Sequence, residues 1–452
     1  MTGVQTCALP ISTQQYNPYK YSGSFGRLNY IFNNEYLLNV TGRIDGSSRF
    51  IPGKQWGKFG AIGAGWIFTE EAWFKNKVPF LSFGKIRGSY GSSGNDNVGN
   101  YQYVSNWSTQ SAGYVYGGSI GYLPNNLDNP NYSWSITKKL DGALETGWFS
   151  NRLLASVDWY RDRSGNQLIQ YTLPSQTGFQ YVTRNFQAVL QNTGWEVAIS
   201  STNIKKKDLS WTTSFNISFS NNKLIKFPGL AASSYGNTYA IGRSVSTVLG
   251  YKYAGINDTT GIYQFYTTKG QKTYTPSAFN KDNLFVLGNP NPKFYGGMRN
   301  TFSYKGITLD VFLEFRKQSG FNYVSQVNNP FGYMTNLPTD ALNNVTEKGK
   351  GAPYERLTSK SYGSAAANVW QYYRTSSAGY GDASYLRVKT VGLSYSLSND
   401  VLKKVKMNSC KVFVNAQNLL TITKYKGNDP ETQSYYGTPP MRTIAGGINF
   451  NF

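Results

Sequence analysis

Few of the 452 residues have side chains that perform acid–base, nucleophilic or metal chemistry. The chain has no histidine, which is the commonest general base and metal ligand. Its two cysteines, Cys7 and Cys410, are too few for a thiolate metal cluster or a disulfide framework. A glycoside hydrolase needs two carboxylates about 5 to 10 Å apart across a cleft, and no pair stands out in that role. The sequence therefore predicts a protein that is not an enzyme and that uses no metal or other cofactor.

Basic side chains outnumber acidic ones, with 45 Lys and Arg against 23 Asp and Glu and a net charge of +22. In a soluble protein such a surplus suggests a nucleic acid or another anionic partner. Here the lysine runs at 205–207 and 403–404 fall in expected turns, and no nucleic-acid-binding motif accompanies them. We therefore expect solvated lysines at turns and at a membrane rim, and no nucleic-acid partner.

The elements that carry the remaining charged residues are expected to be β-strands, because apolar and polar residues alternate along them. In 209–220, Trp211, Phe215 and Ile217 alternate with small polar residues, and 306–316 alternates leucines with charged residues. A strand with lipid on one side and water on the other sorts residues this way, whereas a helix scatters them. No apolar run approaches the roughly 20 residues of a transmembrane helix, and the mean hydropathy is −0.45. The pattern thus favours membrane-spanning strands.

Thirteen segments show this alternation: 21–32, 35–45, 57–68, 81–91, 134–148, 152–163, 192–203, 209–220, 293–304, 306–316, 385–397, 410–420 and 442–452. The connections between them alternate regularly between short and long. The long ones are 46–56, 92–133, 164–191, 221–292, 317–384 and 421–441. Outer-membrane barrels have short periplasmic turns and long extracellular loops. The sequence therefore predicts an all-β fold, an antiparallel transmembrane β-barrel with the long loops at one end.

Several short motifs, in order along the chain, carry a family resemblance. Residues 43–50 read RIDGSSRF, and QWGKF follows at 55–59. The later motifs are KIRGSYG at 85–91, NTGWE at 192–196, GNPNPK at 288–293, SYLRVK at 384–389, QNLLT at 417–421, DPE at 429–431 and the terminal FNF. Together these stretches resemble the SusC/RagA family of TonB-dependent outer-membrane receptors over residues 20–452.

The resemblance implies that residues 13–452 form the C-terminal part of an incomplete barrel, about 13 of about 22 strands. Residues 1–12 resemble a translated sequencing adapter, so we expect them to be a non-native or artefactual leader. The family places its signal peptide, TonB box, plug domain and early strands before this region. An odd number of strands also predicts a missing upstream partner strand, because such barrels have an even number. We therefore expect that this fragment alone transports nothing.

The resemblance further implies active import of large nutrients, glycans or oligopeptides, across the Gram-negative outer membrane. The implied partners are a SusD-like surface lipoprotein, the TonB complex acting through the missing N-terminal part, outer-membrane lipid, and the barrel-assembly machinery, which would read the terminal Phe452. A passive porin-like channel, which needs no plug, and a secreted carbohydrate-binding β protein are the alternatives. The sequence does not choose between glycan and peptide cargo.

Two sets of residues are candidates for this function. Charged residues at the polar strand positions would face the lumen, where they pair with one another or hold the plug: Arg43, Asp45, Arg87, Glu196, Asp310, Glu314, Arg316 and Arg387. Aromatic residues of the long loops would stack on sugars or pack against a peptide, although such rings often pack only against one another. They are Trp107, Tyr114, Tyr116, Tyr122, Tyr235, Tyr239, Tyr372, Tyr373, Tyr435 and Tyr436.

Overall fold

One antiparallel sheet dominates the computed structural model, which describes residues 18–452 apart from 76, 110–114, 117–118, 125, 277–283, 338, 340–353 and 405. Its thirteen strands pair in chain order. They are β1 (Tyr21–Phe32), β2 (Tyr36–Ser47), β3 (Trp56–Trp66), β4 (Leu81–Asn95), β9 (Ser135–Trp148), β10 (Leu153–Gly165), β13 (Val189–Lys205), β14 (Leu209–Lys226), β20 (Phe294–Tyr304), β21 (Ile307–Lys317), β24 (Tyr385–Ser396), β25 (Ser409–Thr423) and β26 (Thr443–Asn451). All thirteen predicted segments are confirmed as strands. The expected leader, residues 1–12, lies outside the described residues.

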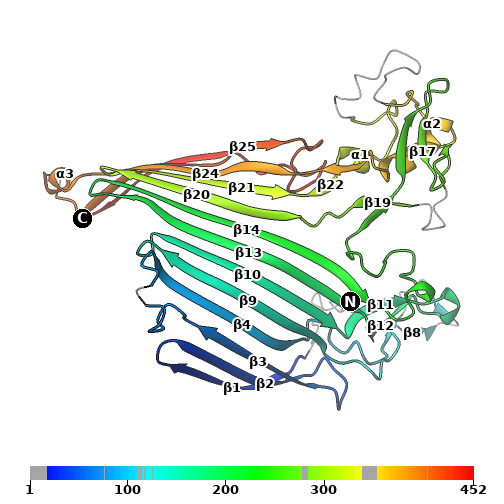
Figure 1. The fold of residues 1–452 in the computed structure, drawn as a ribbon. Helices are drawn as coiled ribbons and strands as arrows, with labels where there is room; N and C mark the ends of the chain where they lie inside the picture. Colours follow the sequence, from blue (N-terminus) through cyan, green and yellow to red (C-terminus); the bar gives the residue numbers. More distant parts are fainter. Residues whose placement is uncertain are drawn as a thin grey trace, which may run out of the picture.

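The sheet is curved, and β1 and β26 form its two edges (Figure 1). Because neighbouring strands are antiparallel, alternate connections fall at opposite ends. The short connections, among them 149–152 and 305–306, lie at the end that carries α3 (Asn399–Lys404) and the C-terminus. The long connections, among them 227–293 and 318–384, lie at the other end. The predicted sorting by length therefore holds for the longest connections, but the connection 48–55, predicted to be long, is shorter than 67–80 at the opposite end. We call the second end the loop end.

Two of the hairpin turns show why the short connections are tight. Asn33 and Asn34 have φ angles of 51° and 58°, and Lys305 and Gly306 have φ angles of 45° and 88°. Turns with two left-handed central residues match the twist of the strands that they join. Asparagine and glycine tolerate that conformation, so these residue types favour a tight reversal.

The pairing register decides which side chains share a face of the sheet, because successive residues of a strand point to opposite sides. One row of directly paired residues crosses the sheet from β10 to β25: Asp158, Glu196, Ser218, Tyr295, Arg316, Tyr385 and Thr423. Towards β2 the row continues through Ala143, Arg87, Gly65 and Leu37. We call the side to which this row points the polar face, and the opposite side the apolar face.

The register shows which of the candidate residues share a face of the sheet. All eight charged candidates lie on the polar face, either in this row or an even number of residues from it along the same strand. Apolar residues of the same sheet lie on the apolar face: Trp211, Phe215, Ile217, Leu309, Leu313, Leu393 and Ile448. Aromatic residues also gather there, as in the directly paired row Trp159, Trp195 and Phe219.

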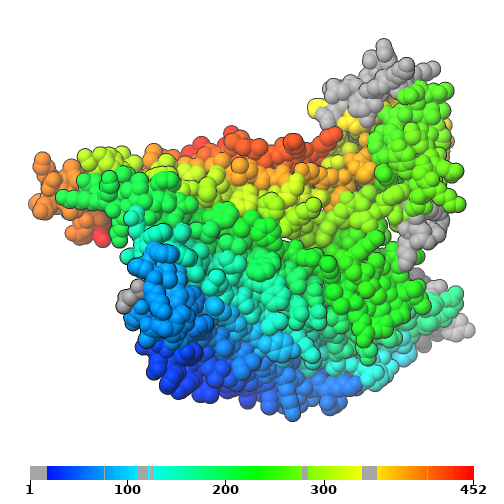
Figure 2. All heavy atoms as spheres, in the orientation of Figure 1, coloured from blue at the N-terminus to red at the C-terminus, as the bar shows by residue number. Residues whose placement is uncertain are grey.

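The long connections contain small sheets and short helices of their own. The strands are β5 (Trp107–Thr109), β6 (Val115–Tyr116), β7 (Ser119–Ile120), β8 (Tyr122–Pro124), β11 (Gln167–Thr172), β12 (Tyr181–Phe186), β15 (Val248–Gly250), β16 (Lys252–Ile256), β17 (Tyr263–Tyr266), β18 (Lys272–Thr273), β19 (Phe285–Gly288), β22 (Ser319–Phe321) and β23 (Tyr380–Asp382). The helices are α1 (Tyr323–Gln326) and α2 (Ala365–Arg374), with 3-10 turns at Ser175–Thr177 and Leu230–Ala232. In the described part of the chain, none of the helices has the length and apolar character needed to cross a membrane. Figure 2 shows that the loop elements protrude as a mass beyond the loop end of the sheet.

Candidate functional site

Arg87 is the centre of an ion-pair network on the polar face of β4, β9 and β10. Its Nε lies 2.7 Å from Glu145 Oε1, and its guanidinium also contacts Asp141 and Asp158. Ala143 is the residue of β9 directly opposite Arg87, and it also pairs with Asp158 of β10. Because alanine is small, the arginine side chain reaches across β9 to the third strand. The guanidinium of Arg87 thus links carboxylates of two neighbouring strands and stabilises their pairing.

Arg387 forms a second network that ties the last long connection, 424–442, to the sheet. Its side chain is only 1% exposed, and its Nη1 lies 2.6 Å from Glu431 Oε2 while Nη2 contacts Asp429. Its Nε donates a hydrogen bond of 3.0 Å to Thr421 Oγ1. A buried guanidinium needs such partners, because desolvation of an unpaired charge is costly. Arg387 therefore fixes the position of the loop rather than offering a charge to a ligand.

Glu314 extends this network along the polar face. Lys389 Nζ lies 3.0 Å from Glu314 Oε2 and 3.7 Å from Glu431 Oε2, so it bridges the wall and the loop. Tyr385 Oη donates a hydrogen bond of 2.7 Å to Glu314 Oε1, and Arg316 Nη2 lies 3.9 Å from the same oxygen. The acidic side chain is thus surrounded by donors from three strand positions.

Three of the four remaining predicted charged residues are also paired locally. Arg43 Nη2 donates to Asp45 Oδ1 at 2.7 Å, and Asp310 accepts a 2.8 Å hydrogen bond from Thr301 Oγ1 beside Arg299. Within the described residues, Glu196 is the only one of the eight candidates without an ion pair, and it lies between Asp158 and Ser218 in the polar row. The sequence predicts that these charges either pair with one another or hold the plug. In the structure, all except Glu196 form ion pairs within the sheet and with its loops.

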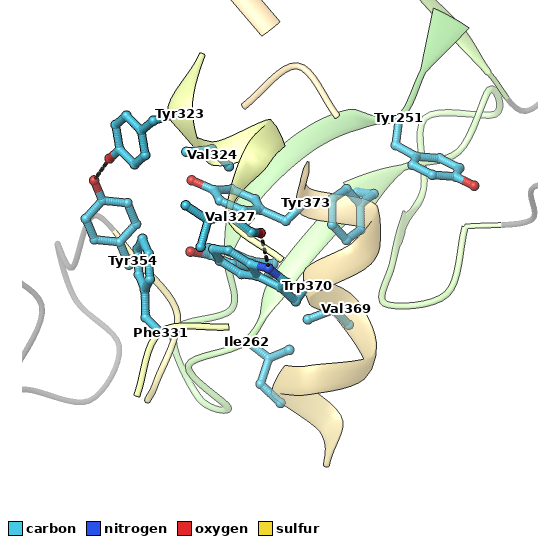
Figure 3. Close-up of a cluster of buried hydrophobic side chains, with 12 residues drawn as sticks. Tyr251, Ile262, Tyr323, Val324, Val327, Phe331, Tyr354, Val369, Trp370 and Tyr373 are labelled. Atoms are coloured by element: carbon cyan, nitrogen blue, oxygen red, sulfur yellow. Dashed lines mark hydrogen bonds between the residues drawn. The ribbon is translucent and has the colours of Figure 1, made fainter. Parts of the chain in front are cut away.

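Aromatic residues of the two longest connections form a buried cluster, the loop core, drawn in Figure 3. The rings of Tyr263 and Tyr373 stack with centroids 3.8 Å apart, and Trp370 Nε1 donates a 3.0 Å hydrogen bond to the carbonyl oxygen of Val327. Tyr373 is only 5% exposed. Its ring, one of the predicted substrate contacts, is therefore enclosed by protein and is not available to a ligand in this arrangement.

Two other predicted contacts pack on the edge of the loop core. The ring of Tyr372 meets Tyr251 and Phe265 edge-on, with centroids 5.3 and 6.0 Å away. The ring of Tyr435 lies 6.5 Å from the ring of Tyr323, centroid to centroid, and its backbone N–H donates a 2.7 Å hydrogen bond to Gln326 Oε1. Packing between loops accounts for both positions.

Tyr235 and Tyr239 belong to a separate cluster beside β11 and β12. Their rings stack with centroids 5.5 Å apart, and Tyr235 also packs 6.0 Å from Phe227. The hydroxyl of Tyr235 donates to the carbonyl oxygen of Gln170. These contacts join two long connections, so the two tyrosines have a structural role here.

Three predicted aromatic contacts remain open to solvent. Trp107 and Tyr122 are 60% and 69% exposed and lie on the same face of the β5–β8 ribbon, because Thr109 pairs with Tyr122. Tyr436 is 73% exposed, and its hydroxyl donates to the carbonyl oxygen of Gln326. Of the two other candidates, Tyr116 lies in β6, and Tyr114 lies outside the described residues. The eight aromatic candidates whose side chains the structure describes thus do not converge on one site.

Glu355 is a buried carboxyl group of the loop core that the sequence did not single out. It is 1% exposed, and the backbone N–H of Tyr263 donates to its Oε2 at 3.5 Å. Burial raises the pKa of Glu355 to about 9, so the group is neutral at neutral pH. The next residue in the chain, Arg356, is exposed. The sequence around Glu355 therefore gives no indication that its side chain is buried.

The described residues contain no group of three or more His, Cys, Asp or Glu arranged to hold a metal ion. At the end of the chain, Phe452 is exposed and its ring lies 5.5 Å from that of Phe450. The aromatic residue that follows β26 is therefore accessible to solvent.

Comparisons with known proteins agree with this architecture. No protein-family profile matches the chain. TonB-dependent receptor P26 of Formosa agariphila is 28% identical over 463 residues, which cover 97% of this chain and 45% of that protein. TonB-dependent receptor SusC of Bacteroides thetaiotaomicron is 28% identical over 435 residues, which cover 91% of this chain and 41% of that protein.

The fold is also similar to that of a solved transporter. The structure of the RagAB peptide transporter superposes with a TM-score of 0.81 at 26% identity, covering 96% of this chain and 48% of that one. The chain therefore spans about half the length of the relatives that it matches. Two of these relatives are named as TonB-dependent receptors, and the third is a peptide transporter. In sequence and in fold the chain is therefore similar to TonB-dependent receptors, among them SusC, and to the RagAB peptide transporter.

Proposed function

We propose that this chain forms barrel wall and extracellular loops of an active nutrient importer. The observation that carries the proposal is the two-faced sheet with all its long loops at one end, together with its similarity to the RagAB peptide transporter. The apolar face would contact outer-membrane lipid, and the polar face would line the lumen. A wall whose charges are already paired would give a plug domain a rigid surface against which to move.

Import of this kind requires parts that act on the wall from outside it. We propose that a SusD-like surface lipoprotein covers the loop end and that the TonB complex acts on a plug supplied by the N-terminal part of the receptor. The exposed terminal Phe452 would be read by the barrel-assembly machinery. The loops then hold the cargo, a glycan or an oligopeptide, until the plug moves.

Uptake in cells tests the proposal. The gene for the full-length receptor is deleted, and uptake of fluorescently labelled oligosaccharide and oligopeptide mixtures is compared in the parent, the deletion strain and a strain without TonB. We expect uptake of one class to fall in both mutant strains. Uptake that persists without TonB but falls without the receptor would identify a passive porin-like channel and overturn active import.

The lipoprotein partner is tested separately by affinity purification of the tagged full-length receptor from outer membranes. A surface lipoprotein should copurify in a near-equal amount, because a lid must stay with its barrel. Recovery of the receptor alone in gentle detergent would contradict this part of the proposal.

A further inference from the structure

A recess opens on the polar face where two neighbouring strands of the sheet part. β14 pairs with β20 only as far as Ser218, opposite Tyr295, but continues to Lys226 on its other side with β13. The turn at 287–293, which leads from β19 into β20, lies opposite the unpaired part of β14. The resulting recess has a volume of about 480 Å³, within the range of roughly 300 to 1,000 Å³ typical of small-molecule sites.

The ring of Tyr160 lies across one wall of this recess, and a glycine makes that position possible. Tyr160, Gly194 and Ser220 form a directly paired row across β10, β13 and β14. A Cβ atom on Gly194 would lie 2.6 Å from Tyr160 Cε1. The ring therefore lies over the glycine, and its face and hydroxyl are held beside the recess.

Asparagine side chains supply most of the polar lining. Asn222 Nδ2 donates a 2.7 Å hydrogen bond to Asn192 Oδ1, and Asn222 Oδ1 accepts from the backbone N–H of Val245 at 3.1 Å. These bonds fix the orientation of the Asn192 carboxamide. Its Nδ2 forms no hydrogen bond with any residue that the structure describes. On the opposite wall, Asn289 Oδ1 accepts the backbone N–H of Asn291 at 2.9 Å, which likewise leaves the Nδ2 of Asn289 available.

The polar groups left available include donors and acceptors, since Ser220, Asn221 and the Oδ1 of Asn291 also belong to the lining and can accept hydrogen bonds. Besides the two amides, they include the hydroxyl of Tyr160 and the ammonium of Lys293, neither of which bonds to another side chain in the described part of the protein. No carboxylate belongs to the described lining. The recess therefore suits a ligand whose groups both donate and accept hydrogen bonds and that carries no cationic group.

We infer that this recess is a binding subsite for a sugar unit of the imported cargo. A sugar presents hydroxyl groups that donate and accept on all sides and an apolar face to an aromatic ring. A free peptide also presents an N-terminal ammonium, for which the described lining offers no carboxylate. The inference rests on the proposed import function and specifies the cargo class. It predicts that the loop-end part of the wall, and not only the exposed loop aromatics, contacts carbohydrate.

Direct binding to the purified full-length receptor tests the inference. Maltohexaose, xylohexaose and chitohexaose serve as sugar probes and an uncharged Gly/Ala hexapeptide as the peptide probe, with binding measured by isothermal titration calorimetry. Three variants remove one donor each: Tyr160→Phe, Asn192→Ala and Lys293→Met. The matched control is Asn39→Ala, because Asn39 also bonds to a facing asparagine, Asn29, on the polar face but lies on β2.

We expect at least one sugar to bind and each recess variant to weaken it by about three- to tenfold, the effect of one lost hydrogen bond. The control should bind like the wild type, and all variants should show wild-type heat-modifiable mobility on gels. Absence of sugar binding, or binding that the recess variants leave unchanged, would overturn the inference. Binding of the peptide alone, with TonB-dependent peptide uptake in cells, would refute the sugar subsite and leave the import function standing.

Discussion

Replacement of Arg387 by methionine should release the loop at 424–442 from the sheet. The guanidinium is 1% exposed, and its loss leaves the nearly buried Asp429 without a cation. Breaking a fully buried ion pair costs about 3–5 kcal/mol. Asp429 keeps hydrogen bonds of 3.0 Å from the backbone N–H groups of Glu431 and Thr432, and Glu431 is partly exposed. We therefore expect a smaller cost, about 2–4 kcal/mol, in the free energy of opening this loop.

Hydrogen exchange of the full-length receptor, followed by mass spectrometry, measures that opening. A cost of about 3 kcal/mol corresponds to roughly 100-fold faster exchange in 424–442. The matched control is Arg299→Met, because the Arg299 ion pair with Asp310 is largely exposed and should contribute only about 0–1 kcal/mol. Exchange in the β-sheet away from the loop should not change in either variant.

The reasoning fails if Arg387→Met leaves exchange in 424–442 unchanged or changes it no more than Arg299→Met does. A double variant separates charge from packing. In Arg387→Met with Asp429→Asn, the uncompensated negative charge is gone, so part of the lost protection should return. If the double variant exchanges faster than the single one, the backbone bonds of Asp429 matter more than its charge.

Three further predictions concern the loop core, the recess and the two faces of the wall. Burial raises the pKa of Glu355 from its ordinary 4.5 to about 9. The loop core should therefore be most stable below pH 4.5 and lose stability as the pH rises towards 9. In the variant Glu355→Gln, hydrogen exchange of the loop core should no longer depend on pH in this way. Gly194→Ala places a Cβ against the Phe219 carbonyl oxygen and should cost about 1–3 kcal/mol in denaturant unfolding, whereas Gly142→Ala, with its nearest neighbour at 3.9 Å, should not. Spin labels in membranes should be accessible to oxygen at 309 and to a water-soluble nickel reagent at 310, and the reverse would shift the register by one residue.

The strands could be predicted from the sequence because their alternation is local and has a period of two. Trp211, Phe215 and Ile217 specify the apolar face of β14 without reference to any other strand. The end of β14 was not predictable in this way, since residues 221–226 do not keep the alternation. They remain in the sheet because β13 pairs with them as far as Val189. The recess depends on this non-local pairing.

The roles of the loop tyrosines could not be predicted, because neighbouring residues of the same type have different surroundings. In the pair Tyr435 and Tyr436, the first packs towards Tyr323 while the second is 73% exposed. In α2, by contrast, Tyr373 faces the loop core because it lies three residues after Trp370 on the same side of the helix. One local signal was available, since Ser364 caps the first turn of α2 with a 3.2 Å hydrogen bond from Ala367 N.

A β-bulge reconciles two features of β24 that strict alternation would place on the same side. Arg387 lies on the polar face and Leu393 on the apolar face, although they are an even number of residues apart. The register shift between Phe312 and Leu313 of β21 leaves Lys389 as the extra residue of β24. Without that residue, either the arginine would lose its loop carboxylates or the leucine would enter the lumen. The bulge therefore allows one strand to anchor a loop near its loop end and to keep an apolar surface along the rest of its length.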